Sequence, residues 1–543
     1  MRQEVPPRRP QLLAGGVGLV CVIPVAVWLL TGFAAPTAAA DWTFTPNQTV
    51  HPLAAGQHLW PDVVSGPGGF AGVTWMDDSQ GEFHIFYSHT QDGGVSWSSP
   101  EVVDARTTGT ASRFPHLALL PSGNVVAVWE DDRSGEFNVY LSKRDPSAGG
   151  PLWSIPQQIN ESGSPENEFD LMNASIAVYS EQRWFVAWTD WRDGDFGQIY
   201  LRTTFTAGQN WGFETRVSDN LGLDPAAFVP CLVVDRTSPA NAIRLHCVAN
   251  DEEGPPTQDR LPNVAHYLSQ NGGATWQRGT ILNDVTDQYQ ESGSRSLTLL
   301  DNGDLICGWL SDASGIGELR SSRSTDHGTS WLPSLVVNQP SEGGIGSAAA
   351  LCASGNEVLV SYELFEDDLN CYFRSSPDGG VTWSEPPVRM DDDTTGGFAG
   401  NSVIALGGPN EVYGVWQDSR PGFSSWQIFA ARGERATLSA EPEFVNPASP
   451  SFGGAWPNPS RSWQVVRLHL PAATDAMRPS AHEPQVTIVA SDGRLVRHIE
   501  SFPGPADRFE WDGRDQNGRA VPPGVYWAIR HNRTPVTRIV RVR

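Results

Sequence analysis

The sequence predicts an all-β protein: a seven-bladed β-propeller followed by a small β-sandwich. The 543 residues include 54 Gly, 42 Pro and 21 Trp, but only 18% are charged. This mix favours many short strands joined by tight turns and leaves few positions for long amphipathic helices. A unit of roughly 50 to 65 residues also recurs along residues 41–435, which suits one four-stranded blade per unit.

Each unit is marked by an apolar second strand that ends in an aromatic residue. Six copies are clear, and a seventh, at residues 246–248, replaces the aromatic with His-Cys-Val. The six aromatic positions are Trp75, Trp129, Trp188, Trp309, Tyr362 and Trp416. Seven copies in phase predict seven blades.

The most specific signal is a turn of the form S/T-x-D-x-G-x-x-W between the third and fourth strands. It is intact at residues 90–97, 324–331 and 376–383, and residues 269–276 carry Asn in place of Asp. The hydroxyl and the carboxylate can bond the turn backbone, Gly supplies a positive φ, and Trp packs under the hairpin. We therefore expect a structural role for Asp92, Trp97, Asn271, Trp276, Asp326, Trp331, Asp378 and Trp383.

These turns resemble the Asp boxes of the sialidase (BNR-repeat) superfamily, and the resemblance covers roughly residues 41–435. It implies a sialidase-like propeller. In that family three Arg hold the substrate carboxylate, a Tyr assisted by Glu is the nucleophile and an Asp is the acid/base. This chain departs from the pattern because it has seven units rather than six, and no Tyr with a Glu partner is evident.

The N-terminal part of the propeller is predicted to close the ring. The seventh unit, from Asn401 to about Arg432, has no Asp box and no fourth strand. Residues 41–46 resemble the strand that follows the first Asp box, and Trp42 precedes Trp97 by one period. We expect the strand at Trp42 to pair beside the third strand near Ile428, which removes an exposed edge.

Strand polarity predicts which loops could hold a ligand. In a four-stranded antiparallel blade, the loops after strands two and four share one face, and the Asp boxes lie on the other. The face without Asp boxes carries a repeated W-x-D-x-R/S pattern, which could bind a sugar or a cation, or could brace the loops. Its candidate ligand-binding residues are Asp132, Arg133, Asp190, Arg192, Asp418 and Arg420.

Two further arginines on this face resemble sialidase site residues. Arg113-Phe114-Pro115 is similar to the family's R-I-P-like signature, and Arg295 begins a first strand. The context does not choose a third among Arg133, Arg192 and Arg420. Two functions stay open: a binding platform for glycans or proteins, and an exo-acting glycoside hydrolase of sialidase type. Catalytic and metal-binding residues remain unassigned, and we expect no cofactor.

The charge and the N-terminus indicate an exported protein that does not bind nucleic acid. The formal net charge of −25 repels phosphate backbones and anionic membrane surfaces. Arg2, Arg8 and Arg9 precede an apolar run that ends in Pro-Thr-Ala-Ala-Ala, which predicts a signal peptide over residues 1–40. The run is also long enough for an uncleaved anchor. We expect a secreted or cell-surface protein with no membrane span after signal removal.

The cysteines beyond the leader are five, so at least one thiol should be free. Cys231 and Cys247 lie symmetrically about a turn near Pro239. They could form a disulfide across a hairpin or could simply be two small buried residues.

The C-terminal part is predicted to be a separate module. Residues 436–454 are rich in Pro, Ser and Gly, as in a linker, and residues 455–543 show alternating strands with Asp-Gly and Asn-Gly turns. Three segments, 456–459, 511–518 and 522–526, resemble the Ig-like domain of flagellar hook-capping proteins and the C-terminal sorting domains of exported bacterial proteins. This resemblance implies export or surface attachment, and the alternative is an inert accessory module.

Overall fold

The computed structural model divides into two compact units, Met1–Leu438 and Ser439–Arg543, and each is described by itself. The division falls inside the segment predicted as a linker. The predicted signal peptide lies outside the described residues. The structure describes residues 42–51, 56–105, 109–147, 151–161, 173–192, 197–218, 226–252, 261–284, 288–315, 317–339, 342–346, 349–366, 368–420, 422, 425–435, 454–456, 460–461, 466–469, 486–490, 495–499, 508–522, 524–530 and 537–542.

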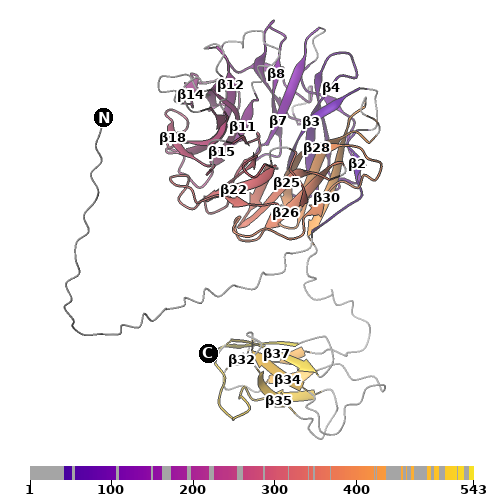
Figure 1. The fold of residues 1–543 in the computed structure, drawn as a ribbon, viewed down its shortest axis with the longest axis vertical. Helices are drawn as coiled ribbons and strands as arrows, with labels where there is room; N and C mark the ends of the chain where they lie inside the picture. The colour runs from indigo at the N-terminus through magenta and orange to yellow at the C-terminus, as the bar shows by residue number, and fades with distance from the viewer. Residues whose placement is uncertain are drawn as a thin grey trace, which may run out of the picture. The chain divides into compact units, whose positions relative to one another are not determined.

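Seven antiparallel sheets surround a common centre in the first unit, and their first strands lie nearest to it (Figure 1). The predicted seven-bladed β-propeller is therefore confirmed. Blades 1 to 3 comprise β3 (His58–Gly66), β4 (Phe70–Asp77), β5 (His84–Thr90) and β6 (Glu101–Val102); β7 (Ser112–Leu119), β8 (Val125–Asp131), β9 (Asn138–Arg144) and β10 (Gln157–Gln158); and β11 (Ser175–Val178), β12 (Trp184–Asp190), β13 (Gln198–Thr204) and β14 (Thr215–Arg216).

The remaining blades follow the same order, and residues 246–248 lie on the second strand of blade 4, as predicted. Blades 4 to 7 comprise β15 (Ala227–Asp235), β16 (Arg244–Asp251), β17 (Asn263–Ser269) and β18 (Gln277–Ile281); β19 (Gln290–Glu291), β20 (Leu297–Leu299), β21 (Leu305–Ser311), β22 (Glu318–Ser324) and β23 (Leu335–Val336); β24 (Ala350–Ser354), β25 (Glu357–Phe365), β26 (Leu369–Ser376) and β27 (Val388–Arg389); and β28 (Ala399–Gly408), β29 (Glu411–Asp418) and β30 (Gln427–Arg435).

The ring closes as predicted, because N-terminal strands complete blade 7. β1 (Trp42–Phe44) and β2 (Gln48–Thr49) both pair antiparallel with β30, with Trp42 opposite Arg435 and Thr49 opposite Phe429. Trp42 is buried, and its ring meets Phe373 of blade 6 edge-on at 5.5 Å. The first strand therefore joins blade 7 by hydrogen bonds and blade 6 by packing.

Backbone hydrogen bonds confirm that the two kinds of loop lie on opposite faces. In blade 1 the Asp-box amide of Gly93 donates to Gly69 O in the loop after the first strand, at 3.0 Å. At the other end, Asp78 N donates to Gln57 O just before the first strand, at 3.2 Å. The face that carries the Asp boxes is called the Asp-box face below, and the other is called the opposite face.

The Asp boxes act through their own turns. In the third intact copy, Asp378 accepts hydrogen bonds from Ser376 Oγ (2.8 Å), Thr382 N (2.9 Å) and Thr382 Oγ1 (2.7 Å), while Gly380, at φ 84°, donates to Ser376 Oγ. Asp92 and Asp326 make the equivalent bonds, and Asn271 differs only in that its Nδ2 donates to Thr275 Oγ1. The box tryptophans Trp97, Trp276, Trp331 and Trp383 pack against the hydrophobic clusters between blades. This arrangement matches the structural role that the motif predicts.

The possible disulfide between Cys231 and Cys247 does not form. Across β15 and β16, Cys231 is opposite Val248, whereas Cys247 is opposite Leu232. Because successive side chains of a strand alternate between faces, this offset of one residue places the two thiols on opposite sides of the sheet. All five cysteines in the described residues are free.

The second unit contains two sheets in its described residues, β31-β33-β36 and β32-β38-β37-β34-β35. Trp511 and Tyr526 meet edge-on at 5.2 Å in a core with Val486, Ile488 and Val496. The Ig-like β-sandwich remains a prediction. The strands are β31 (Gly454–Trp456), β32 (Ser460–Arg461), β33 (Val466–His469), β34 (Val486–Ala490), β35 (Leu495–Ile499), β36 (Arg508–Trp511), β37 (Gly524–Arg530) and β38 (Thr537–Val542). No helix in the described ranges is long and apolar enough to cross a membrane.

Candidate functional site

The start of the first strand is distorted in the same way in several blades. A residue other than Gly has a positive φ there in blades 1, 2, 3, 4 and 7, and in four of these the register with the second strand shifts at the same point. Such backbone is strained, and bulges of this kind re-aim side chains beside functional sites. The residues are Trp60 (φ 53°), Phe114 (φ 50°), Asn173 (φ 43°), Val229 (φ 56°) and Asn401 (φ 51°).

In five blades, a side chain of the preceding blade holds the segment at the start of the first strand. In blade 1, Trp60 N donates to Gln417 Oε1 of blade 7 at 2.9 Å. Four other blades repeat the bond, each time with an acceptor near the end of the previous blade's second strand. These pairs are Asn173 N to Glu130 Oε1 (2.7 Å), Val229 N to Thr189 Oγ1 (3.1 Å), Ser292 N to Asn250 Oδ1 (2.7 Å) and Ser402 N to Glu363 Oε1 (2.7 Å). The blades are thus fastened to each other at the rim of the channel.

The distorted segments surround a cavity of about 300 Å³ on the opposite face, at the mouth of the central channel. We call it the mouth cavity. Its aromatic wall is formed by Trp60, which is 43% exposed, and Phe114, whose rings meet edge-on at 5.1 Å. The other lining residues are Pro61, Pro115, His116, Asn173, Val229, Glu291, Ser292, Gly293, Ser294, Arg295, Gly346, Ala349, Ala350, Asn401, Ser402 and Val403.

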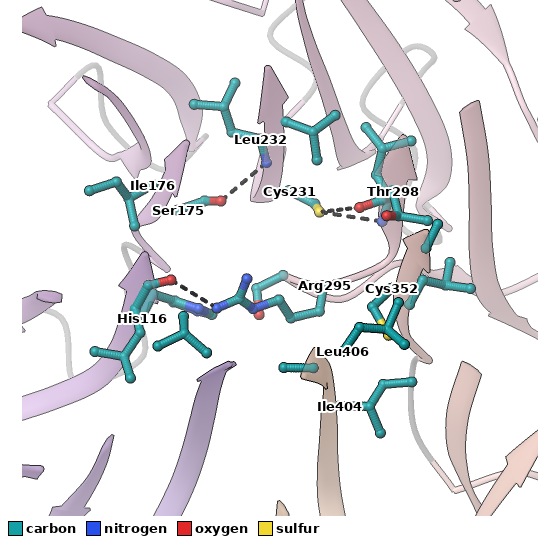
Figure 2. Close-up of a pocket in the computed structure, with 18 of the residues that line it drawn as sticks. His116, Ser175, Ile176, Cys231, Leu232, Arg295, Thr298, Cys352, Ile404 and Leu406 are labelled. Carbon is teal, nitrogen blue, oxygen red and sulfur yellow. Dashed lines mark hydrogen bonds between the residues drawn. The ribbon is translucent and has the colours of Figure 1, made fainter. Parts of the chain in front are cut away.

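Arg295 forms the floor of the mouth cavity by crossing the channel. Its guanidinium donates to both carboxylate oxygens of Asp62 on β3, with 2.9 Å from Nε to Oδ1, and to Leu117 O on β7 at 3.0 Å. Figure 2 shows the guanidinium lying across the channel, with Cys231 and Cys352 in the surrounding wall. A second cavity, of about 760 Å³, reaches Arg295 from the Asp-box side. Arg295 therefore separates the two ends of the channel.

Asp62 contacts the groups that position Arg295. It is buried, accepts Leu117 N at 2.7 Å, and lies 3.5 Å from His116 Nδ1. Burial by itself raises the pKa of Asp62, but the charge of Arg295 and the hydrogen bonds from His116 and Arg295 outweigh it and hold the pKa well below its usual range. The carboxylate therefore stays ionised and neutralises Arg295.

Glu291 brings a carboxylate to the rim of the mouth cavity. Its Oε2 accepts a hydrogen bond from the Tyr289 hydroxyl at 2.8 Å. Burial and the neighbouring carboxylate raise the pKa of Tyr289. A Tyr with a Glu partner is thus present, although the sequence pattern did not reveal it.

The Asp and Arg of the W-x-D-x-R pattern bind each other. Asp190 accepts the Trp188 indole (3.0 Å), Arg192 N (3.0 Å) and Arg192 Nε (2.7 Å). The guanidinium also lies over the Tyr200 ring at 4.3 Å. The same arrangement recurs in blade 2 with Asp131 and Arg133 and in blade 7 with Asp418 and Arg420. This bonding fits the bracing interpretation of the pattern.

The other predicted site residues lie around the cavity rather than in it. Asp132 Oδ1 accepts Ala111 N at 2.7 Å, and so ties the loop after β8 to the segment before β7. The Arg113 guanidinium lies over the Phe137 ring at 3.7 Å and 3.6 Å from Glu130. Of the predicted ligand-binding residues, Arg295 is the one that lines the mouth cavity. The described residues also contain no group of His, Cys, Asp and Glu that could hold a metal ion.

Sequence reasoning missed most of the cavity residues, among them Trp60, Asn173, Glu291 and Asn401. One signal was available for Trp60. The pair Trp60-Pro61 lies at the same point of its blade as Phe114-Pro115, and both open a first strand at a register shift. An aromatic-Pro pair in phase with the repeat therefore marks the cavity wall.

Comparison with known proteins assigns no family to the chain. No protein-family model and no curated protein matches the sequence. Similar solved structures include a protein of unknown function from Dyadobacter fermentans (13% identity, TM-score 0.47, 73% of this chain and 99% of that chain) and a Penicillium chrysogenum α-L-arabinanase complexed with arabinobiose (13%, 0.44, 72% and 98%). The NanB sialidase of Streptococcus pneumoniae is also similar (12%, 0.39, 72% and 71%). An ulvan lyase matches at 10% identity and a TM-score of 0.47, over 70% of this chain and 95% of its own. The chain is a seven-bladed β-propeller with distant structural similarity to sialidases, arabinanases and ulvan lyases.

Proposed function

We propose that this protein is a secreted or cell-surface propeller that binds a glycan at the mouth cavity. The observation that carries the proposal is Trp60. A large aromatic ring, 43% exposed, stands at the edge of a cavity of about 300 Å³, on a strained backbone held by Gln417. Cavities lined by aromatic side chains and a few placed polar groups are typical of ligand sites.

The chemistry around Trp60 suits a sugar. The apolar C–H face of a pyranose packs on an aromatic ring, while its hydroxyls need donors and acceptors at defined positions. The side chains of Asn173, Ser294 and Asn401 offer both kinds of group along the cavity wall. Because the strained segments are fastened to neighbouring blades, these groups are arranged before a ligand arrives.

Hydrolysis of a glycoside is the second candidate function. It is favoured by one contact, the 2.8 Å hydrogen bond from Tyr289 to Glu291 at the cavity rim. Activity of sialidase type further needs arginines that converge on a substrate carboxylate. Arg133, Arg192 and Arg420 are instead bound to their own Asp, and Arg295 is bound to Asp62. The binding function therefore has more support.

Export and attachment complete the proposal. The leader expected at residues 1–40 would direct the chain out of the cell, and the C-terminal unit would attach it to a surface. The net charge of −25 would keep the protein apart from nucleic acids.

A glycan array tests the proposal, with fluorogenic glycosides, including a sialoside, assayed in parallel. We expect binding without turnover, and loss of that binding in Trp60→Gly, which removes the ring while the backbone keeps its positive φ. Turnover that Glu291→Gln abolishes would establish the hydrolase instead. No binding and no turnover would leave a protein ligand as the partner.

A further inference from the structure

We infer that the mouth cavity selects uncharged glycans and discriminates against those that carry carboxylate or sulfate groups. This inference rests on the proposed function, because it names the class of glycan that the same site takes. It is carried by the positions of three charged side chains, Arg295, Asp62 and Glu291.

The cation that lines the cavity is already neutralised. Arg295 donates to both oxygens of Asp62 and to Leu117 O, so Nε and Nη2 have their partners within the protein. An incoming carboxylate would have to share this guanidinium with a buried Asp, or displace that Asp and leave it unpaired. A buried carboxylate left without its cation is strongly unfavourable. Arg295 therefore acts as a floor and does not offer a bidentate site for an anion.

Besides Arg295 and His116, which both lie beside Asp62, Glu291 is the titratable residue among the described residues that line the cavity. Glu291 lines the cavity and points its carboxylate toward Tyr289, whose hydroxyl it accepts at 2.8 Å. An anionic sugar unit in a cavity of about 300 Å³ would lie within a few ångströms of this carboxylate. Like charges at such distances in a partly dehydrated site repel each other more strongly than in bulk water.

The polar groups that are left suit hydroxyls. The lining amide and hydroxyl side chains of Asn173, Ser294 and Asn401 are uncharged. Together with the Trp60 ring, they offer hydrogen bonds and an apolar surface without net charge. An uncharged sugar needs no counter-ion here, whereas an anion would lose its hydration without gaining one.

The experiment compares glycans in matched pairs on the intact protein. Each pair has one linkage and one length, and differs in a charged group: an oligouronate against its methyl ester, and a sulfated oligosaccharide against its unsulfated form. We expect the uncharged member to bind more tightly, on the order of tenfold. The preference should shrink as salt is raised from 50 to 500 mM, because screening weakens the repulsion.

Two variants probe the cause separately. Glu291→Gln removes the repulsion, and Asp62→Asn frees the Arg295 guanidinium; each should shift the affinity ratio toward the anionic member, on the order of tenfold. Circular dichroism shows whether each variant folds. If one of them does not, the affinity ratio of the other variant alone tests the inference. Tighter binding of the anionic members to the unaltered protein, or a ratio that neither variant moves, would overturn the inference and leave the proposed glycan site intact. Absence of binding to every glycan would overturn the proposed function as well.

Discussion

Arg295 of blade 5 and Asp62 of blade 1, 233 residues apart in sequence, form a bidentate ion pair across the central channel. Asp62 is 1% exposed, so its charge depends on this partner. The pair closes the floor of the mouth cavity and links blades that share no hydrogen-bonded strands.

Removing one member of this pair should destabilise the propeller. Arg295→Met leaves a buried carboxylate without its cation, and we expect a loss of about 3 kcal/mol in the free energy of unfolding, measured by urea denaturation. Arg295→Met with Asp62→Asn should recover most of the loss, because the uncharged amide can still accept Leu117 N. Equal stabilities of the single and double variants would show that the ion pair contributes nothing.

An Asp box should affect stability and leave ligand binding unchanged. Asp378→Ala removes the acceptor of two backbone amides and two hydroxyls, so we expect the stability to fall by roughly 1 to 3 kcal/mol. Asp378→Asn should cost less, because Asn271 already fills the same place in blade 4. Thermal melting measures the stability of both variants, and a glycan titration measures their affinity for the ligand. Loss of binding with an unchanged Tm would place the ligand on the Asp-box face.

The N-terminal strands should be required to close the ring. Deleting residues 41–50 removes β1 and β2 and leaves β30 as an open edge, which is prone to pair with other chains. We expect aggregation, measured by light scattering. Trp42→Ala keeps the strand and removes the packing on Phe373, so a soluble but less stable protein is expected. A monomeric deletion variant with unchanged stability would contradict this role.

Glu363 should make stability fall between about pH 4.5 and pH 7. Burial raises its pKa to about 7, so the folded protein binds a proton that the unfolded chain releases above about pH 4.5. Stability is therefore highest below that range and decreases as the pH rises through it. Glu363→Gln can keep the acceptor for Ser402 N without the charge, and we expect it to stabilise the protein at pH 8 by about 2 kcal/mol and to flatten the profile. The expectation fails if the two proteins show parallel profiles.

The fold was predictable because its signals are local and repeated. Asp378 and Trp416 each belong to motifs that recur along the sequence, and strand polarity then gives the face of each loop. The closing strand at Trp42 was predictable because blade 7 visibly lacks one. Repetition makes each observation a check on the others.

The site was less predictable because its residues do not repeat. Trp60 comes from blade 1, whereas Glu291 and Arg295 come from blade 5, and each of the three carries a different chemistry. Arg192 belongs to a pattern that does repeat, and its role is structural: it braces a loop through its hydrogen bond to Asp190. The partner of Arg295 lies 233 residues away, and only the closed ring brings the two together.

The most direct test of the account is isothermal titration of one array-selected neutral oligosaccharide into the unaltered protein, Trp60→Gly and Asp378→Ala. If the ligand binds in the mouth cavity, Trp60→Gly should lower the affinity at least about tenfold, because the ligand packs on the Trp60 ring. The Tm should not fall, because glycine tolerates the φ of 53° at this position. Asp378→Ala should bind the oligosaccharide with unchanged affinity and have a lower Tm. The opposite result, unchanged affinity in Trp60→Gly and lost affinity in Asp378→Ala, would contradict the central claim.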